Sequence, residues 1–113
     1  MEYTYVTFEV AKLAKEKGYK CIYGGGYNKE TDKYASYRSK PTYPAPTQSL
    51  LQKWLREKHD IHIINRYIHD EGKNKYEFTV YDNVNKGWGI AEVYETYEEG
   101  LEDKLMEALK IIP

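Results

Sequence analysis

A tyrosine-rich, basic segment is the part of the sequence whose residue types could carry out recognition chemistry. Its tyrosines alternate with cations, and the residues concerned are Tyr23, Tyr27, Lys29, Lys33, Tyr34, Tyr37, Arg38, Lys40 and Tyr43. Aromatic rings that stack on bases, beside cations that bind phosphates, are typical of proteins that bind single-stranded nucleic acid. Tyrosine with serine and glycine is also typical of adaptable protein-binding loops. The simpler interpretation is favoured, in which some tyrosines pack the segment onto the fold and the charges are only solvated, because exposed loops are ordinarily polar.

A second candidate site is the polar face of a helix predicted after Pro46. The residues on this face are Gln48, Gln52, Lys53 and Arg56. Glutamine and arginine read base edges, and lysine and arginine bind phosphates. With a helix before it and a β-hairpin after it, this helix would make a winged-helix-like nucleic-acid-binding module. The opposite face, with Leu50, Leu51, Trp54 and Leu55, favours a core helix whose polar face is merely solvated.

The remaining reactive residues predict no catalytic residue, cofactor or metal site. His59, His62 and His69 match no compact zinc spacing, and Cys21, the only cysteine, is distant from them in the sequence. Gly24-Gly25-Gly26 lacks the Gly-Lys-Ser/Thr ending of a phosphate-binding loop. The chain contains no Gly-x-Ser-x-Gly motif, so no serine nucleophile is assigned.

Length, composition and charge limit these alternatives. The 113 residues are typical of a single domain, and 41% hydrophobic with 31% charged residues indicates a folded chain. Residues 1–60 contain eleven Lys or Arg and seven Asp or Glu, whereas residues 61–113 contain six and eleven, and the net charge is −1. This uneven charge allows an anionic partner on one face only, and the balance is far weaker than in a dedicated DNA-binding domain. No stretch approaches the roughly 18 apolar residues of a membrane span.

Hydrophobic periodicity predicts the elements that must position these residues. Apolar stripes predict helices over residues 7–17, from the N-cap Thr47 to about residue 60, and after the N-cap Thr96. Strands are predicted over residues 19–23, 61–69, 75–82 and 88–94, with turns at 71–74 and 83–87. Residues 24–46, rich in Gly and Pro, are predicted to form a long loop.

These elements predict an α+β fold in the order α-β-α-β-β-β-α, within one domain over residues 1–113. Three amphipathic helices and a small antiparallel sheet imply two layers, with the helices on one face of the sheet. Trp54, its leucine neighbours and the aliphatic stripe of the last helix are expected to cover that face. The opposite face, which carries Glu77, Thr79 and Tyr81, is left to solvent or to a partner.

The first strand of the predicted meander has an ambiguous pattern. Ile61 and Ile63 fall on one face of a regular strand, whereas Ile64 and Ile68 fall on the other. A bulge near Ile63-Ile64, or burial of both faces, would explain this pattern.

Residues 43–63, with the sequence YPAPTQSLLQKWLREKHDIHI, resemble a family of small uncharacterised proteins found in prophages and mobile elements of gut Bacteroidetes. The opening TFEVAKLAKEKG of residues 7–18 and the closing TYEEGL of residues 96–101 are similar to that family too. The resemblance spans most of the chain, and its central segment is the most specific part. It implies a cytoplasmic bacterial or phage context, and it carries over no activity and no catalytic residue.

Three function hypotheses follow from these observations. The leading one is a non-enzymatic protein-binding or accessory module that acts through the tyrosine-rich segment, the exposed sheet face, or both. The alternatives are a nucleic-acid-binding module that uses the basic first half, and a small enzyme or enzyme inhibitor. A cytoplasmic location is expected, because Cys21 permits no intrachain disulfide and the first residues lack a signal-peptide pattern. The chain is expected to be a monomer, or a homodimer paired along an exposed edge strand.

Overall fold

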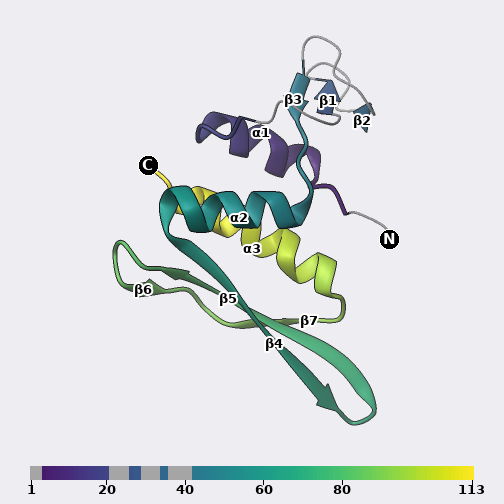
Figure 1. Cartoon of the computed structure of the whole chain (residues 1–113). Helices are drawn as coiled ribbons and strands as arrows, with labels where there is room; N and C mark the ends of the chain where they lie inside the picture. Colours follow the sequence, from purple (N-terminus) through teal and green to yellow (C-terminus); the bar gives the residue numbers. More distant parts are fainter. Residues whose placement is uncertain (1–3, 21–25, 29–33, 36–41) are drawn as a thin grey trace.

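The computed structural model describes residues 4–20, 26–28, 34–35 and 42–113. The elements follow in the order α1 (Phe8–Glu16), β1 (Gly26–Asn28), β2 (Tyr34–Ala35), β3 (Thr42–Pro44), α2 (Gln48–His59), β4 (Ile61–Asp70), β5 (Lys73–Asp82), β6 (Gly87–Trp88), β7 (Glu92–Tyr94) and α3 (Tyr97–Ile111). Figure 1 shows the helices on one side of a sheet whose β4–β5 hairpin extends beyond them. The predicted α+β class is therefore confirmed.

Each described helix begins at a threonine whose side chain caps the first turn. The hydroxyl groups of Thr7, Thr47 and Thr96 each accept a hydrogen bond from the backbone N–H three residues later. A side-chain acceptor at this position satisfies one of the backbone donors that a helix start leaves unpaired. The caps predicted at Thr47 and Thr96 are confirmed. At the other end of α2, Asp60 takes the left-handed conformation, with φ of 53°, that ends many helices.

The β4–β5 hairpin has a continuous register along its whole length. Its two turn residues, Glu71 and Gly72, have positive φ of 49° and 76°, as a two-residue type I′ turn requires. The expected bulge near Ile63-Ile64 is wrong, because every residue of β4 has one partner in β5. Burial of both faces is wrong too, since Ile63 is buried while Ile64 is 43% exposed. Ile64 and Ile68 therefore lie on the open face of the sheet, opposite the face that carries Ile61 and Ile63.

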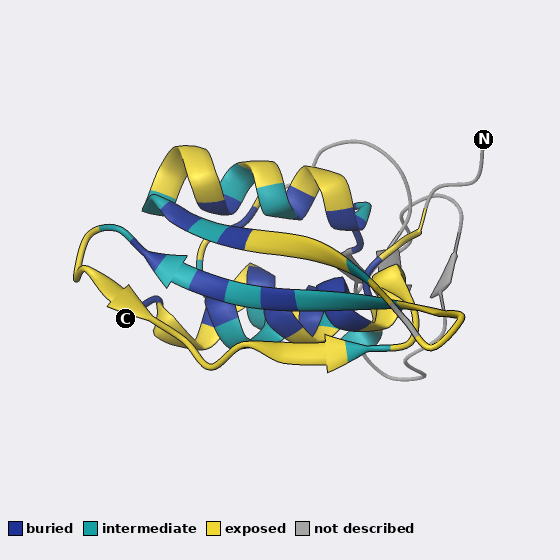
Figure 2. Cartoon of the chain, turned by 90° about the horizontal axis from the view of Figure 1, so that it is seen from below, coloured by how far each residue is buried: buried dark blue, intermediate teal, exposed yellow. Residues whose placement is uncertain are grey.

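The described strands form two sheets. In the larger one, β5 is central, β4 pairs along one side of it, and β6 and β7 pair with successive parts of its other side. The smaller sheet has the order β2-β1-β3, and α1 packs against it and against α3. Figure 2, viewed from below, shows α3 behind the larger sheet, α2 alongside β4, and no described element in front of the sheet.

One cluster of buried hydrophobic side chains joins the three helices to the larger sheet. The aliphatic stripe predicted for the last helix, from Leu101 to Ile112, is buried against Phe78. Leu51 of α2 is fully buried, and Trp54 packs against the same cluster with its ring edge-on to Tyr19. The prediction that α2 and α3 cover the same side of the sheet is confirmed. Leu50, predicted on the apolar side of α2, is exposed instead.

Three stretches differ from their predictions. Residues 24–46, predicted as a loop, contain the strands of the smaller sheet. Tyr19 and Lys20 lie outside any strand, and the rest of the strand predicted over residues 19–23 lies outside the described residues. The strand predicted over residues 88–94 is divided into β6 and β7, because Trp88 pairs with Tyr81 and Glu92 with Phe78, which leaves residues 89–91 opposite only residues 79–80 of β5. The carbonyl of Ile90 in this link accepts a hydrogen bond from Lys104 of α3.

Candidate functional site

The described strands place three of the predicted tyrosine-segment residues side by side. Tyr27 of β1 pairs with Tyr34 of β2 on one side and with Tyr43 of β3 on the other. The other predicted members, Tyr23, Lys29, Lys33, Tyr37, Arg38 and Lys40, lie outside the described residues. A recognition site in this segment therefore stays a prediction.

The polar residues predicted on α2 do not share one exposed surface. Gln48 is 4% exposed and lies against α3. The side-chain amide of Gln52 donates to the carbonyl oxygen of Ile63 in β4, at 3.4 Å. Lys53 and Arg56 are exposed. Both glutamines that were expected to read base edges thus link α2 to its neighbours, and only the two cations remain available on this face.

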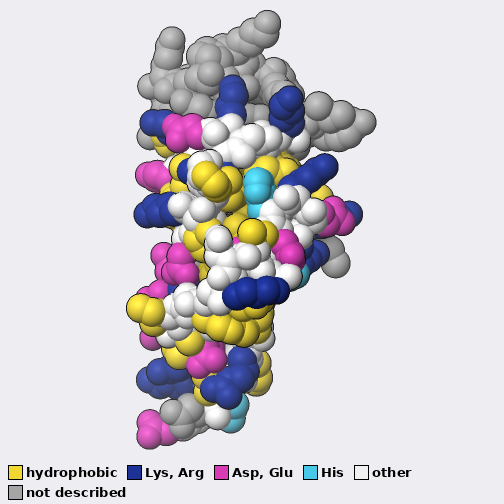
Figure 3. Space-filling model, turned by 90° about the vertical axis from the view of Figure 1, so that its left-hand side faces the viewer, with side chains coloured by type: hydrophobic (Ala, Val, Ile, Leu, Met, Phe, Trp, Pro, Cys, Tyr) yellow, Lys and Arg dark blue, Asp and Glu magenta, His cyan; other side chains and the backbone are white. Residues whose placement is uncertain are grey.

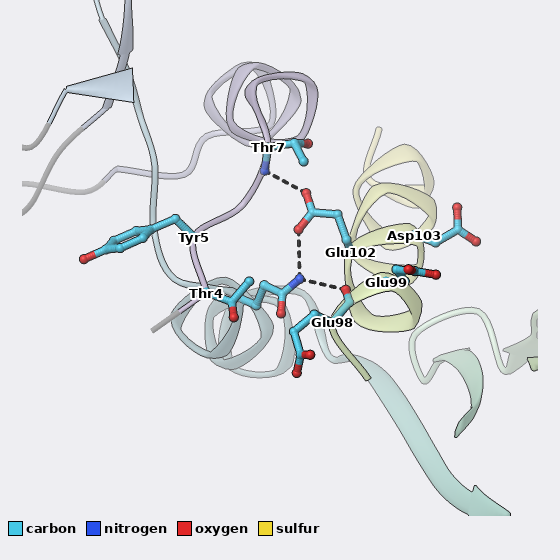
Figure 4. A pocket seen from close by; sticks show the side chains of 8 residues that line it. Thr4, Tyr5, Thr7, Glu98, Glu99, Glu102 and Asp103 are labelled. Atoms are coloured by element: carbon cyan, nitrogen blue, oxygen red, sulfur yellow. Dashed lines mark hydrogen bonds between the residues drawn. The ribbon is translucent and has the colours of Figure 1, made fainter. Parts of the chain in front are cut away.

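A hollow of about 430 Å³ lies between the chain before α1 and the first turns of α2 and α3. Figure 4 shows Glu102 pointing across it toward Thr7, whereas Asp103 points away. Nε2 of Gln48 donates to Oε1 of Glu102 and to the carbonyl of Glu98, at 2.9 and 3.0 Å. The backbone N–H of Thr7 donates to Oε2 of Glu102 at 2.8 Å. Both oxygens of Glu102 therefore hold the three helices together, and Glu102 is a structural residue.

A second hollow, of about 390 Å³, lies between the end of α2, the turn after β5 and the residues after α3. Asp82 is buried there, and Oδ1 of its carboxylate accepts hydrogen bonds from two backbone N–H groups of the following turn. Asp60 accepts a hydrogen bond from Asn83 and contacts Nε2 of His62, each at 2.7 Å. These carboxylates hold the turns at this end of the sheet.

The pH dependence of stability should reveal the Asp60 contacts. The hydrogen bond from Asn83, and then the one from His62, hold the pKa of the Asp60 carboxyl below its ordinary value of 3.8. Ionised Asp60 therefore stabilises the fold above that pH, and this contribution is lost as the pH falls through the lowered pKa. Asp60→Asn keeps a residue that tolerates the left-handed conformation and removes the charge.

We expect the difference in free energy of unfolding between wild type and Asp60→Asn to shrink as the pH falls from about 6 to about 3. Urea denaturation at several pH values measures it. A difference that stays constant over this range would contradict a stabilising role for the Asp60 charge.

Metal ligation and membrane insertion find no support in the part of the chain that the structure describes. Within it, no group of three or more His, Cys, Asp and Glu side chains is arranged to hold a metal ion. The ring of His59 packs edge-on against Trp54, with ring centres 4.7 Å apart. Every described helix is too short or too polar to span a bilayer.

The face of the larger sheet that points away from the helices carries exposed hydrophobic side chains. Tyr81 pairs with Trp88 in the strand register, and directly paired residues share a face. Side chains alternate between the two faces along each strand, so the registers of β4 and β7 with β5 show which of their residues share the face of Tyr81 and Trp88. We call this surface the outer sheet face, and its hydrophobic and neutral residues are Ile64, Ile68, Thr79, Tyr81, Trp88 and Val93.

An aromatic pair lies at one end of the outer sheet face. The ring of Trp88 lies 4.4 Å from that of Tyr81, between centres, and Trp88 is still 65% exposed. Ile64 and Val93 are also exposed on this face. Single exposed hydrophobic residues are ordinary on a protein surface, whereas a group that includes Trp and Tyr is typical of an interaction site.

Charges around the outer sheet face are mixed. Nε of Arg66 lies 3.4 Å from Oε1 of Glu77, its cross-strand neighbour on this face. Figure 3 shows Lys, Arg, Asp and Glu side chains scattered among hydrophobic ones over the side of the described molecule that it presents. Such a mixture differs from the basic stripe that is typical of nucleic-acid-binding surfaces.

The sequence pattern located this face only in part. It assigned Thr79 and Tyr81 to the open face, and it gave no sign that Trp88 or Val93 would join them. A tryptophan next to a turn is equally compatible with burial in the core. The cross-strand pairing of Trp88 with Tyr81 is the signal that decides its face, and this pairing depends on the length of the turn between β5 and β6.

Comparisons with protein-family models, with curated proteins and with solved structures return no match for this chain. The resemblance of residues 43–63 to the prophage and mobile-element family therefore stays a prediction.

Proposed function

We propose that this chain is a non-enzymatic protein-binding module whose recognition surface is the outer sheet face. The observation that carries the proposal is the Trp88–Tyr81 pair, which stands on a sheet face that no described element covers, with Trp88 65% exposed. Tryptophan and tyrosine are the side chains that most often dominate the free energy of protein binding. A partner that covers this pair would remove a large apolar area from water.

The surroundings of the aromatic pair support the same proposal. Ile64 and Val93 add exposed aliphatic area on the same face. The Arg66–Glu77 ion pair and Lys75 supply polar groups among them. An apolar centre with polar groups around it is the usual composition of a protein interface.

Protein is favoured over nucleic acid as the partner because the charges on the outer sheet face are of mixed sign. The guanidinium of Arg66, a group that binds phosphates in nucleic-acid complexes, here lies 3.4 Å from the carboxylate of Glu77. An enzyme is less favoured because the inward carboxylates of Glu102 and Asp82 each hold backbone or side-chain donors of the fold. A cytoplasmic location and a bacterial or phage context belong to the same proposal, since the lone Cys21 suits a reducing compartment.

Peptide binding to a Trp88→Ala variant tests the proposal. A random peptide library displayed on phage and selected against the wild-type chain supplies the probes. We expect Trp88→Ala to weaken the binding of selected peptides roughly thirty-fold, about 2 kcal/mol, because it removes the largest exposed apolar group of the face. Fluorescence polarisation with labelled peptides measures the change.

Leu50→Ala is the matched control, since Leu50 is 52% exposed but lies on α2, away from the outer sheet face. It should leave peptide binding unchanged. Selected peptides that bind Trp88→Ala as tightly as wild type would rule out the outer sheet face as the recognition surface. Salt-sensitive binding of single-stranded oligonucleotides that depends on Trp88 would replace protein by nucleic acid as the partner.

A further inference from the structure

The outer edge of β4 offers an unpaired row of backbone groups. β4 has ten residues and pairs with β5 alone, so its other side is an edge of the larger sheet. Asp70 and Lys73 flank the two-residue turn and form a hydrogen-bonded pair across the hairpin. By alternation, the N–H and C=O groups of the odd-numbered residues of β4 point to the outside.

Among the residues that the structure describes, a side chain occupies only the beginning of this edge. The side chain of Gln52 in α2 donates to the carbonyl of Ile63, which confirms that this carbonyl points outward. Figure 1 shows the hairpin continuing past the helices beyond this point. Asn65, Tyr67 and His69 therefore present their backbone donors and acceptors with no described strand beside them.

The edge carries the charged Arg66 but lacks proline and bulges, two other features by which proteins protect exposed strands. Its sequence, IHIINRYIHD, contains no proline and no lysine, and its register with β5 contains no bulge. Long edges without such features pair readily with another extended strand. The hydrogen-bonding pattern of the edge thus specifies an occupant in the extended conformation.

We infer that residues 65–69 of β4 pair antiparallel with the same residues of a second copy of this chain. A two-fold axis lets one interface satisfy both free edges, as in most symmetric dimers. The antiparallel direction also sets the start of β4, against which α2 packs, toward the hairpin turn of the other copy, so the two α2 helices lie at opposite ends of the paired stretch.

The register of this pairing follows from three residues. A two-fold axis at Arg66 would set two like charges side by side, which destabilises a sheet. An axis at Asn65 would require the carbonyl of Ile63, which Gln52 already occupies. An axis at Ile68 would set Asn65 opposite the turn residue Glu71 and leave it unpaired. An axis at Tyr67 uses the whole free stretch and places Asn65 beside His69 of the second copy.

The exposure of Tyr67 fits this register. Tyr67 is 54% exposed, and its ring lies 5.7 Å from that of Tyr76 between centres. An axis at Tyr67 brings the two copies of this ring next to each other, and aromatic cross-strand pairs stabilise sheets. The outer sheet face stays open in this dimer, so the inference is independent of the proposed function.

Proline at position 69 tests the edge without breaking the hairpin. The N–H of His69 points outward, so His69→Pro removes no hydrogen bond to β5, and a thermal melt checks that the variant folds. Because of the two-fold axis, the variant loses the hydrogen bond from the N–H of residue 69 at two places in the interface. We therefore expect the dissociation constant of the dimer to rise roughly thirty-fold. His69→Ala removes the same side chain and keeps the N–H, so it should dimerise like wild type. Sedimentation over a wide range of concentrations measures all three proteins.

A disulfide tests the register directly. In a Cys21→Ser background, Tyr67→Cys should form a covalent dimer under mild oxidation, because the two Cα atoms would lie about 5.5 Å apart. Leu50→Cys in the same background is the control and should not crosslink. Trp88→Ala should dimerise unchanged. A wild-type chain that stays monomeric at the highest concentration, or a His69→Pro dimer as tight as that of His69→Ala, would overturn the inference.

Discussion

Replacing Gly100 by alanine is expected to lower the free energy of unfolding by about 2 to 3 kcal/mol, although alanine is the better helix former. Gly100 is buried in the first turn of α3, where an added Cβ would overlap Cδ2 of Phe78 and lie 2.8 Å from Cδ2 of Tyr94. Phe78 is 1% exposed, so its ring has no free space to enter. The cost of this overlap exceeds the roughly 1 kcal/mol that alanine adds to a helix.

Urea denaturation of Gly100→Ala measures this loss, with Glu99→Ala as the matched control. Glu99 is the exposed neighbour in the same helical turn, and its replacement should change stability by no more than about 0.5 kcal/mol. In a Phe78→Leu background, the smaller side chain leaves room, so Gly100→Ala should cost less there than in wild type. An unchanged or higher stability of Gly100→Ala in the wild-type background would show that α3 does not approach β5 so closely.

The helices were predictable from the sequence because their signals are local. The capping residues Thr47 and Thr96 stand next to the turns that they stabilise, and the stripe from Leu101 to Ile112 repeats at the helical period. Such signals depend on neighbours within a few residues along the chain. They fixed the side that each helix buries, with Leu50 as the exception.

The strands were harder to predict because their stabilising contacts come from distant parts of the chain. β1 is only three residues long, and it is held by partners in β2 and β3 whose identity no local pattern gives. Ile64 followed a hydrophobic pattern that suggested burial, yet the sheet has no second layer on that side. Hydrophobic residues therefore mark both faces of β4, and only the packing of the helices distinguishes them.

The residues of the candidate site also divide into those that local patterns predicted and those that depend on distant contacts. Tyr81 was placed on the open face by simple alternation within β5, which is a local property. Trp88 reaches that face through a turn and a two-residue strand, and its position became clear only from the pairing with β5. The glutamines of α2 were predicted to be exposed because they are polar. Gln48 is instead buried and donates hydrogen bonds to α3.

Lys104 is the clearest residue that the helical pattern could not place. It lies within the buried face of α3 and is fully buried, although lysine ordinarily indicates a solvated position. Its Nζ donates to Glu92 at 2.6 Å, to Glu107 at 3.0 Å and to the carbonyl of Ile90 at 3.1 Å. All three N–H groups of the ammonium are thus satisfied. The contacts fix the link between β6 and β7, the two strands that carry Trp88 and Val93.

Lys104→Ala is expected to lower the free energy of unfolding by about 3 to 4 kcal/mol, since it removes this group of bonds and leaves a cavity under the β6–β7 link. Lys104→Met retains most of the apolar stem, so it should lose less, and the difference between the two variants measures packing apart from charge. Lys110→Ala, at an exposed position of the same helix, should change stability by no more than about 0.5 kcal/mol. A Lys104→Ala variant as stable as Lys110→Ala would contradict the buried contacts.

Alkaline pH isolates the contribution of the Lys104 charge. Burial by itself lowers the pKa of this ammonium, but the hydrogen bonds to Glu92 and Glu107 outweigh it and raise the pKa above the ordinary value of 10.5. A raised pKa in the folded state stabilises the fold fully below 10.5, and this contribution is lost as the pH rises through the folded-state pKa. The pKa of Tyr94 is raised as well, by burial and by Asp103, but Tyr94 is present in wild type and in Lys104→Met alike. The stability difference between these two proteins should therefore shrink above about pH 10.5, and a difference independent of pH would mean that the ammonium adds only its packing.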